Sequence, residues 1–220
     1  MKNDKTRTAH RYIVVEGPIG VGKTSLAERL AESLGSGLLL ENAKENPFLE
    51  RFYMNPRQVA LPTQLYFLFE RARQIRELSQ TDLFKPMYVA DFLMEKDRLF
   101  AELTLNEDEL GLYEQVYSHL TLDVPTPDLV IYLQAPVEVL LQRIAKRKAP
   151  GERFIEIAYL QRLVDAYTEF FYYYTGAPLL IVNAAEINPV NNEQDYALLL
   201  DHVRNIRSGR HYLNPLPIAL

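Results

Sequence analysis

Residues 12–32, with the sequence YIVVEGPIGVGKTSLAERLAE, restrict the possible folds more than any other part of the chain. An apolar run is followed by a glycine-rich turn and then by leucines at every fourth position, a spacing typical of one helix face. The turn matches the pattern GxxxxGK[ST] through Gly17, Gly22, Lys23 and Thr24. A strand, such a loop and a helix in this order predict an α/β fold.

The chemistry of this loop favours nucleotide phosphates. Glycines let successive main-chain N–H groups surround phosphate oxygens, and the N-terminus of the following helix adds positive potential. Lys23 supplies a point charge, and the hydroxyl of Thr24 suits Mg²⁺. We therefore expect a site for a nucleoside triphosphate with Mg²⁺. Its expected loop residues are Gly17, Pro18, Ile19, Gly20, Val21, Gly22, Lys23, Thr24 and Ser25.

The rest of the chain alternates short apolar runs with longer helix-like segments, which is typical of a parallel sheet covered by helices on both faces. The expected strands are 12–15, 38–40, 87–90, 129–133 and 179–182. We therefore expect a five-stranded, three-layer P-loop fold. Pro47 and Pro62 are each expected to open a helix. We predict a single domain over residues 1–220, with a flexible leader at 1–10 and a tail at 208–220.

Composition narrows the partners. The net charge of −5 argues against a surface that binds nucleic-acid phosphates. No apolar run approaches the roughly 20 residues that span a bilayer, so no membrane partner is expected. The chain has no cysteine, which agrees with a reducing compartment. We expect a cytoplasmic protein that acts on a small molecule.

Three polar residues stand out among apolar neighbours. Gln64 and Arg71 are seven positions apart and so share one helix face, where an amide and a guanidinium can read a base edge or simply lie in solvent. Asp91 follows the third expected strand, at the edge where such sheets bind ligands. It is a candidate general base for a hydroxyl acceptor, and the other interpretation is a helix cap.

Taken together, these segments resemble the deoxynucleoside kinase family, which includes the deoxycytidine, deoxyguanosine and deoxyadenosine kinases. The resemblance runs from about residue 12 to about residue 188. Besides Glu41, Tyr53, Gln64 and Arg71, it rests on EGPIGVGKTS, DFLMEKDR, VIYLQAPVEVLLQRIAKR and AYLQRL. The loop alone is shared with unrelated nucleotide-binding proteins, whereas the whole set is specific.

On the acceptor side, the resemblance implies that Glu41 or Asp91 handles the sugar 5′-hydroxyl, with Asp91 matching the family's general base. Tyr53 and Glu152 would hold the 3′-hydroxyl. Thr24 and Asp91 would be the protein groups closest to Mg²⁺. The resemblance also implies a homodimer.

For the base and the donor, the resemblance implies two further groups. Gln64 would bond the base, and Arg71 with Asp97 would complete its recognition, as in the purine and deoxycytidine enzymes. Arg143 and Arg147 would belong to the helix and lid that close over the phosphates of ATP, where they oppose the charge of the transition state.

Two departures from the family pattern remove positive charge. Phe92 and Leu93 follow Asp91 where the family typically has arginine and serine. The lid has Ala149 and Pro150 where a further arginine is usual. Losing one cation that contacts the transition state costs about 10²–10³ in rate when nothing replaces it. The basic residues proposed from sequence to replace it are Lys146, Lys148 and Arg153.

We therefore predict an ATP- and Mg²⁺-dependent kinase that phosphorylates the 5′-hydroxyl of a deoxynucleoside, with a purine base. One alternative is a kinase of nucleoside monophosphates or of another small metabolite. A second is a weakly active nucleotide-binding protein that regulates a partner. Substrate profiling separates the two kinases, and the regulatory protein would bind nucleotide tightly with negligible phosphoryl transfer to any nucleoside.

Overall fold

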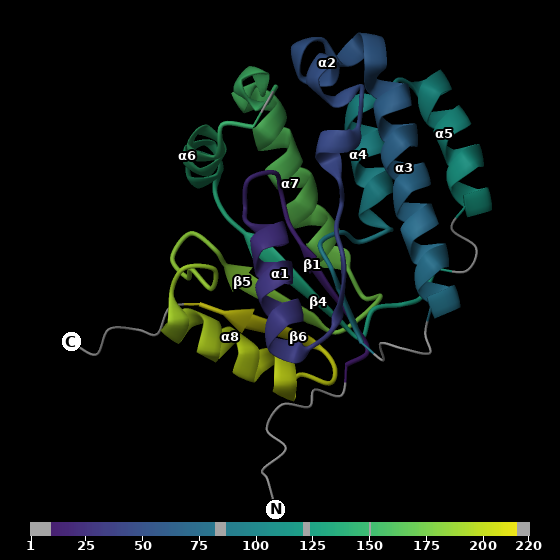
Figure 1. The fold of residues 1–220 in the computed structure, drawn as a ribbon. Coiled ribbons are helices and arrows are strands. Elements are labelled where there is room, and N and C mark those ends of the chain that lie inside the picture. The colour runs from purple at the N-terminus through teal and green to yellow at the C-terminus, as the bar shows by residue number, and fades with distance from the viewer. Residues whose placement is uncertain (1–9, 82–86, 121–123, 150, 215–220) are drawn as a thin grey trace, which may run out of the picture.

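The computed structural model describes residues 10–81, 87–120, 124–149 and 151–214. These residues form a parallel six-stranded sheet in the order β2-β3-β1-β4-β5-β6, with helices on both faces (Figure 1). The predicted α/β fold is confirmed, with one strand more than expected. The strands are β1 Tyr12–Glu16, β2 Gly37–Leu39, β3 Tyr88–Ala90, β4 Leu129–Gln134, β5 Leu179–Asn183 and β6 Arg210–Leu213.

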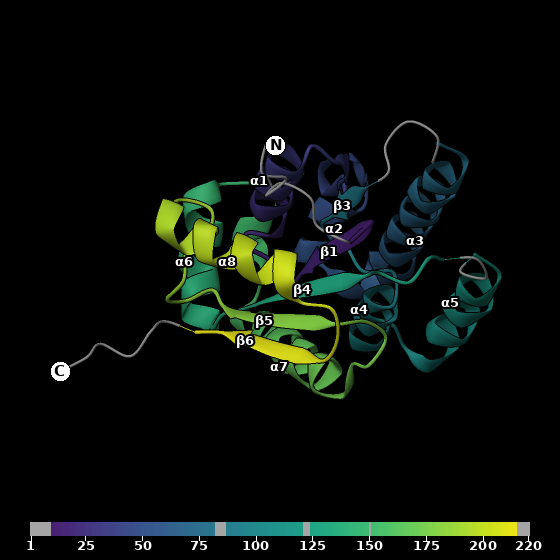
Figure 2. The same cartoon turned by 90° about the horizontal axis from the view of Figure 1, so that it is seen from below.

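The helices cover the sheet in two layers. Figure 2 shows α1 and α8 on one side of the sheet and α7 on the opposite side. The helices α3, α4 and α5 pack against one another beside the sheet (Figure 1). The helical segments are α1 Lys23–Leu34, η1 Ala43–Glu45, α2 Leu49–Met54, α3 Pro56–Thr81, α4 Lys96–Thr104, α5 Glu107–Leu120, α6 Val137–Arg147, η2 Glu152–Phe154, α7 Ile157–Tyr173 and α8 Glu193–Asn205.

The register of the central strand positions the site. In β1, Val14 pairs with Ala90 of β3, and Val15 pairs with Ile131 of β4. The carboxyl ends of these parallel strands therefore meet at one edge of the sheet, so the turn after β1 lies beside the segment that follows β3. All five residues of β1 are buried, because both faces of this strand are covered.

One expectation about elements was wrong, and another is confirmed only when the kink in α3 is considered. The expected tail contains β6, which the sequence hides because an edge strand is only half buried: Leu213 is buried while Tyr212 is exposed. The expectation for Pro62 is confirmed, because α3 consists of two helices joined across a kink at Val59 (φ −137°). The proline therefore falls in the first turn after that kink, where its missing N–H is tolerated.

Several expectations lie outside the described residues. These are residues 1–9 of the expected leader, residues 215–220 of the expected tail, and Pro150 of the lid. His10, the last residue of the expected leader, is described and buried. Within the described ranges, no helix has both the length and the apolar character needed to cross a membrane.

Candidate active site

The turn after β1 has the conformation expected of a phosphate-binding loop. Gly17 has φ +151°, and a Cβ there would lie 2.5 Å from the main-chain oxygen of Leu133, so only glycine fits. Gly22, with φ +107°, immediately precedes α1. The ammonium of Lys23 reaches back over the loop and donates to the oxygen of Gly17 at 2.7 Å. Burial lowers the pKa of Lys23 to about 8.

A buried carboxylate that sequence reasoning missed holds the base of this loop. Glu16, the last residue of β1, has no exposed surface. Its Oε1 accepts from the N–H of Gly17 at 2.8 Å and from the hydroxyl of Tyr167 at 2.9 Å, while Oε2 accepts from the N–H of Leu93 at 2.8 Å. One side chain therefore joins the loop, the segment after β3 and α7.

Asp91 lies immediately after β3 and contacts the loop. Its Oδ2 accepts from the hydroxyl of Thr24 at 2.5 Å, and its Oδ1 accepts from the N–H of Glu41 at 2.6 Å. Burial raises the pKa of Asp91, while the hydrogen bond from Thr24 and the charge of Lys23 oppose that shift. Asp91 thus connects the loop to the segment after β2.

Thr24 and Asp91 also suit the expected metal. Both offer the hard oxygen ligands that Mg²⁺ prefers, and Mg²⁺ beside a nucleotide takes only one or two protein ligands because phosphates and water supply the rest. No cluster of three or more histidine, cysteine or acidic side chains with metal-binding geometry is found in the part of the chain that the structure describes. The residues present therefore fit Mg²⁺ held together with a nucleotide.

The expected base-reading residues lie on and against α3. Arg71 is buried between Glu41 and Asp97, with an ion pair to each. Its guanidinium carbon is 5.2 Å from the ring centroid of Phe67. Two helical turns before Arg71, the amide of Gln64 donates a hydrogen bond to the hydroxyl of Thr104 at 3.2 Å. Asp97 has no exposed surface and lies behind Arg71, so it orients the guanidinium.

The two expected lid arginines, Arg143 and Arg147, have different partners. Arg147, at the end of α6, forms a bidentate pair with Glu152 of η2, with Nε 3.1 Å from Oε2. Arg143 donates to the main-chain oxygens of Val21 at 2.7 Å and Ala184 at 2.6 Å. It therefore ties the phosphate loop to the turn after β5 and does not reach the cavity with Arg147.

One cavity brings most of these side chains together. The predicted residues that line it are Ile19, Gly20, Lys23, Thr24, Glu41, Tyr53, Gln64, Arg71, Asp91, Arg147 and Glu152. Predicted residues that do not line it are Gly17, Pro18, Val21, Gly22, Ser25, Asp97 and Arg143. Lining residues that sequence reasoning missed are Ala43, Leu49, Phe52, Thr63, Phe67, Lys96, Phe100 and Tyr159. The aromatic ones were missed because their helical spacing reads equally well as core.

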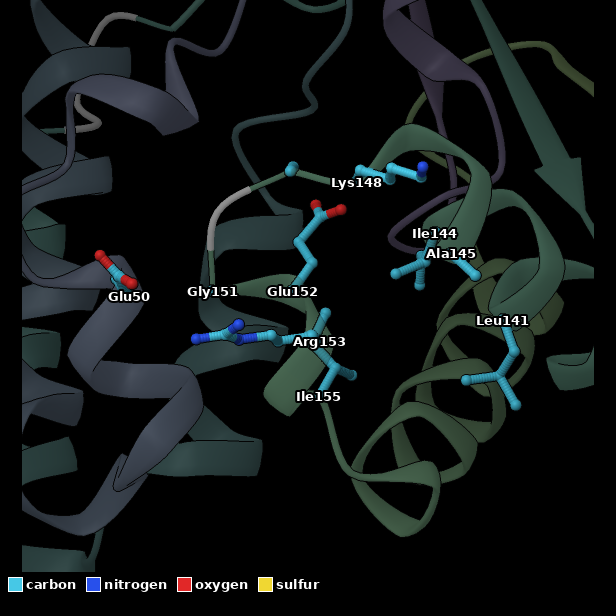
Figure 3. A pocket seen from close by; sticks show the side chains of 10 residues that line it. Glu50, Leu141, Ile144, Ala145, Lys148, Gly151, Glu152, Arg153 and Ile155 are labelled. Carbon is cyan, nitrogen blue, oxygen red and sulfur yellow. The ribbon is translucent and has the colours of Figure 1, made fainter.

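A second cavity lies between α2, α6 and the segment around η2 (Figure 3). It is lined by apolar residues of α6 and by charged residues that include Glu50, Lys148 and Arg153. Figure 3 shows the guanidinium of Arg153 directed toward the side where Glu50 lies. The two cavities share Glu152.

A glycine loop after a central strand, with its threonine hydrogen-bonded to an acidic residue at the end of the neighbouring strand, is the arrangement typical of P-loop proteins. The sequence profile of the deoxynucleoside kinase family matches residues 13–207. The chain therefore belongs to the deoxynucleoside kinase family, and the expected family and enzyme class are confirmed.

Individual relatives agree with this assignment. The chain is 34% identical over 200 residues to deoxyguanosine kinase of Bacillus subtilis (strain 168), covering 89% of this chain and 97% of that protein. It is 29% identical over 199 residues to deoxyadenosine kinase of Lactobacillus acidophilus, covering 83% and 89%. Deoxyadenosine kinase from M. mycoides with bound dATP has the same fold, with a TM-score of 0.75, 22% identity and coverage of 88% and 99%.

Proposed function

We propose that the protein transfers the γ-phosphoryl group of ATP to the 5′-hydroxyl of a purine deoxynucleoside, with Mg²⁺. The observation that carries this proposal is the shared cavity: Lys23 and Thr24 of the phosphate loop face the same space as Gln64 and Arg71 of α3. A donor and a small polar acceptor can therefore meet there. The relatives named deoxyguanosine kinase and deoxyadenosine kinase support a purine.

The acceptor end of the cavity suits a nucleoside. Phe67 offers an aromatic face for a base, and Gln64 and Arg71 offer an amide and a guanidinium to its edge. Tyr53 and Glu152 line the wall toward the lid and would take the sugar 3′-hydroxyl. Burial raises the pKa of Tyr53 well above its ordinary value, so its hydroxyl stays a hydrogen-bond donor at neutral pH.

Two carboxylates compete for the proton of the 5′-hydroxyl. Asp91 is the base that the resemblance implied, but both of its oxygens already accept hydrogen bonds, from Thr24 and from the N–H of Glu41. The side chain of Glu41 keeps 18% exposure, and only one of its oxygens pairs with Arg71. We therefore favour Glu41 as the proton acceptor and Asp91 as the group that orients Thr24 and the metal.

The remaining groups bind and shield the donor. Loop N–H groups and Lys23 would hold the phosphates, Arg147 would oppose charge on the transferring group, and Arg143 would keep the loop in place. Mg²⁺, when bound, neutralises phosphate charge and orients the nucleotide. The homodimer and the cytoplasmic location stay predictions.

The first test incubates the purified protein with Mg²⁺-ATP and each of the four deoxynucleosides separately, and measures the monophosphate formed. We expect transfer to deoxyguanosine, deoxyadenosine or both. Product from nucleoside monophosphates alone would favour the alternative kinase. Tight ATP binding with no product from any acceptor would favour the regulatory alternative.

A second test separates the carboxylates. Glu41→Gln should lower kcat by about 10²–10⁴ at near-normal ATP affinity, because it removes the proton acceptor. Asp91→Asn should instead weaken Mg²⁺-ATP binding and raise the Mg²⁺ concentration needed for half-maximal rate. Glu45→Gln, on the exposed surface of η1, is the matched control. An active Glu41→Gln variant beside an Asp91→Asn variant with normal Mg²⁺ dependence would return the base role to Asp91.

A further inference from the structure

The positions where the family pattern has arginine and serine are used here for packing. Phe92 is 0% and Leu93 is 1% exposed, and both belong to the main hydrophobic core. Neither lines the nucleotide cavity. The N–H of Leu93 is fixed by Glu16, which ties the segment to the base of the loop. A cation for the transferring phosphoryl group must therefore come from elsewhere.

The basic residues proposed from sequence do not meet this need. Lys148 and Arg153 line the second cavity, between α2 and α6 (Figure 3). Lys146 lies on the exposed surface of α6. None of the three lines the cavity that contains the phosphate loop.

Lys96 does line that cavity, together with Thr24, Glu41 and Asp91. It is the first residue of α4, and its side chain is only 2% exposed. Its ammonium lies 4.7 Å from the ring centroid of Phe100 and 3.8 Å from Oε2 of Glu16, which is beyond hydrogen-bond distance. Glu16 accepts hydrogen bonds from three other donors, so Lys96 contributes only its charge to this carboxylate.

The position is unfavourable for a charged lysine. Burial and the nearby guanidinium of Arg71 lower the pKa of Lys96 to about 8, although Glu16, Asp97 and Asp91 oppose that shift. The N-terminus of α4 also repels a cation. A buried titratable group that faces a cavity and has a shifted pKa is a candidate for a functional site.

We infer that Lys96 is a catalytic residue that supplies the positive charge missing after Asp91, by donating a hydrogen bond to the transferring phosphoryl group. The inference rests on the proposed function. In that reaction the 5′-oxygen forms a bond to the γ-phosphorus, and the bond from the γ-phosphorus to the β,γ-bridging oxygen breaks to release ADP. The hydroxyl proton goes to a carboxylate, Glu41 in our proposal. Lys96 keeps its proton throughout and stabilises charge on the equatorial oxygens.

The test compares Lys96→Met and Lys96→Arg with the wild type in kcat, in KM for the deoxynucleoside and ATP, and in melting temperature. Lys96→Met should lower kcat by about 10²–10³ while both KM values change by less than about threefold. Lys96→Arg should recover at least about tenfold of that loss, because it restores a cation. A merely structural role would lower the melting temperature and leave kcat of the folded fraction unchanged. Lys96→Gln replaces the methionine variant if the latter does not fold, since it keeps a polar group beside Glu16.

Two further variants serve as a control and as a test of another candidate cation. Lys44→Met alters an exposed lysine of η1 and should leave kcat unchanged. Lys148→Met tests the competing cation. A folded Lys96→Met or Lys96→Gln variant with kcat within about threefold of an active wild type overturns the inference, as does a large loss in Lys148→Met alone. A wild type that phosphorylates no deoxynucleoside overturns the proposed function, and the role of Lys96 falls with it.

Discussion

The substitution Glu16→Gln tests whether one buried carboxylate holds the floor of the site together. Glu16 accepts three hydrogen bonds, from Gly17, Leu93 and Tyr167, and lies 3.8 Å from Lys96. A glutamine has nearly the same shape but replaces one acceptor oxygen by an N–H₂ group. If the glutamine oxygen keeps the hydrogen bonds from Gly17 and Tyr167, the N–H₂ group faces the N–H of Leu93, and two donors then meet without an acceptor.

The magnitude follows from these contacts. Leaving a buried donor such as the Leu93 N–H unpaired costs about 1–3 kcal/mol. The two remaining hydrogen bonds lose their charge assistance, and Lys96 loses a neighbouring negative charge. Removing one partner of a buried ion pair costs about 3–5 kcal/mol where measured. We therefore expect a loss of at least about 3 kcal/mol, equivalent to a fall in melting temperature of about 6–12 °C for a chain of this size.

The measurement is urea denaturation at neutral pH, followed by far-UV circular dichroism because the chain has no tryptophan. Tyr167→Phe is the matched control, since it removes one of the three hydrogen bonds without leaving a donor unpaired. It should cost about 1 kcal/mol. In the double variant the two losses should not add, because both changes act on the same carboxylate.

The reasoning is refuted if Glu16→Gln costs less than Tyr167→Phe. That result would mean that the oxygen and the N–H₂ group of the glutamine both find hydrogen-bond partners, or that the negative charge of Glu16 adds no net stability at this position. A change in the slope of the denaturation curve would point instead to an altered unfolded state, and the comparison would then be made by melting temperature.

Three further outcomes follow from the site. Gly17→Ala should destabilise the protein by more than about 2 kcal/mol in thermal unfolding because the new Cβ meets a main-chain oxygen, whereas Gly35→Ala, also at positive φ but in open space, should cost about 1–2 kcal/mol. Above about pH 8 the affinity for ATP, measured by titration calorimetry, should fall by up to about tenfold per pH unit, because Lys23 with a pKa of about 8 must take up a proton on binding. Arg71→Met combined with Asp97→Ala should lower kcat/KM for purines by about 10–100-fold and admit thymidine, and an unchanged substrate ranking would contradict the base-reading role.

The parts of the site that the sequence predicts are those with local signals. The phosphate loop lies within eight consecutive residues and has its own strand and helix on either side, so the sequence alone predicts the positions of Lys23 and Thr24. The position of Asp91 follows from the rule that ligands bind at the carboxyl ends of parallel strands. The bond between Thr24 and Asp91 confirms that these two elements meet.

The parts that it does not predict depend on contacts between distant segments. Glu16 and Leu93 are 77 positions apart, and neither departs from the pattern of its own strand or loop, so no periodicity indicates their hydrogen bond. Lys96 is followed by two more charged residues, as on a solvated helix face, yet its side chain is buried. The edge strand β6 was missed because a half-exposed strand lacks a continuous apolar run.

Because Phe92 is buried, we expect that an arginine at this position would not replace the missing positive charge. Phe92 has no exposed surface, and Lys96 follows Leu93 by one turn, with its N–H bonded to the oxygen of Leu93 at 3.2 Å. Phe92→Arg would place a guanidinium in the core at a cost of several kcal/mol, and its side chain would not reach the cavity. We therefore expect Phe92→Arg to lower the melting temperature and not to restore kcat when combined with Lys96→Met. The measurement is kcat of the double variant with the deoxynucleoside that the wild type prefers. Recovery of kcat would show that the segment containing Phe92 can turn toward the nucleotide, and it would contradict the argument that its burial prevents it from supplying the cation.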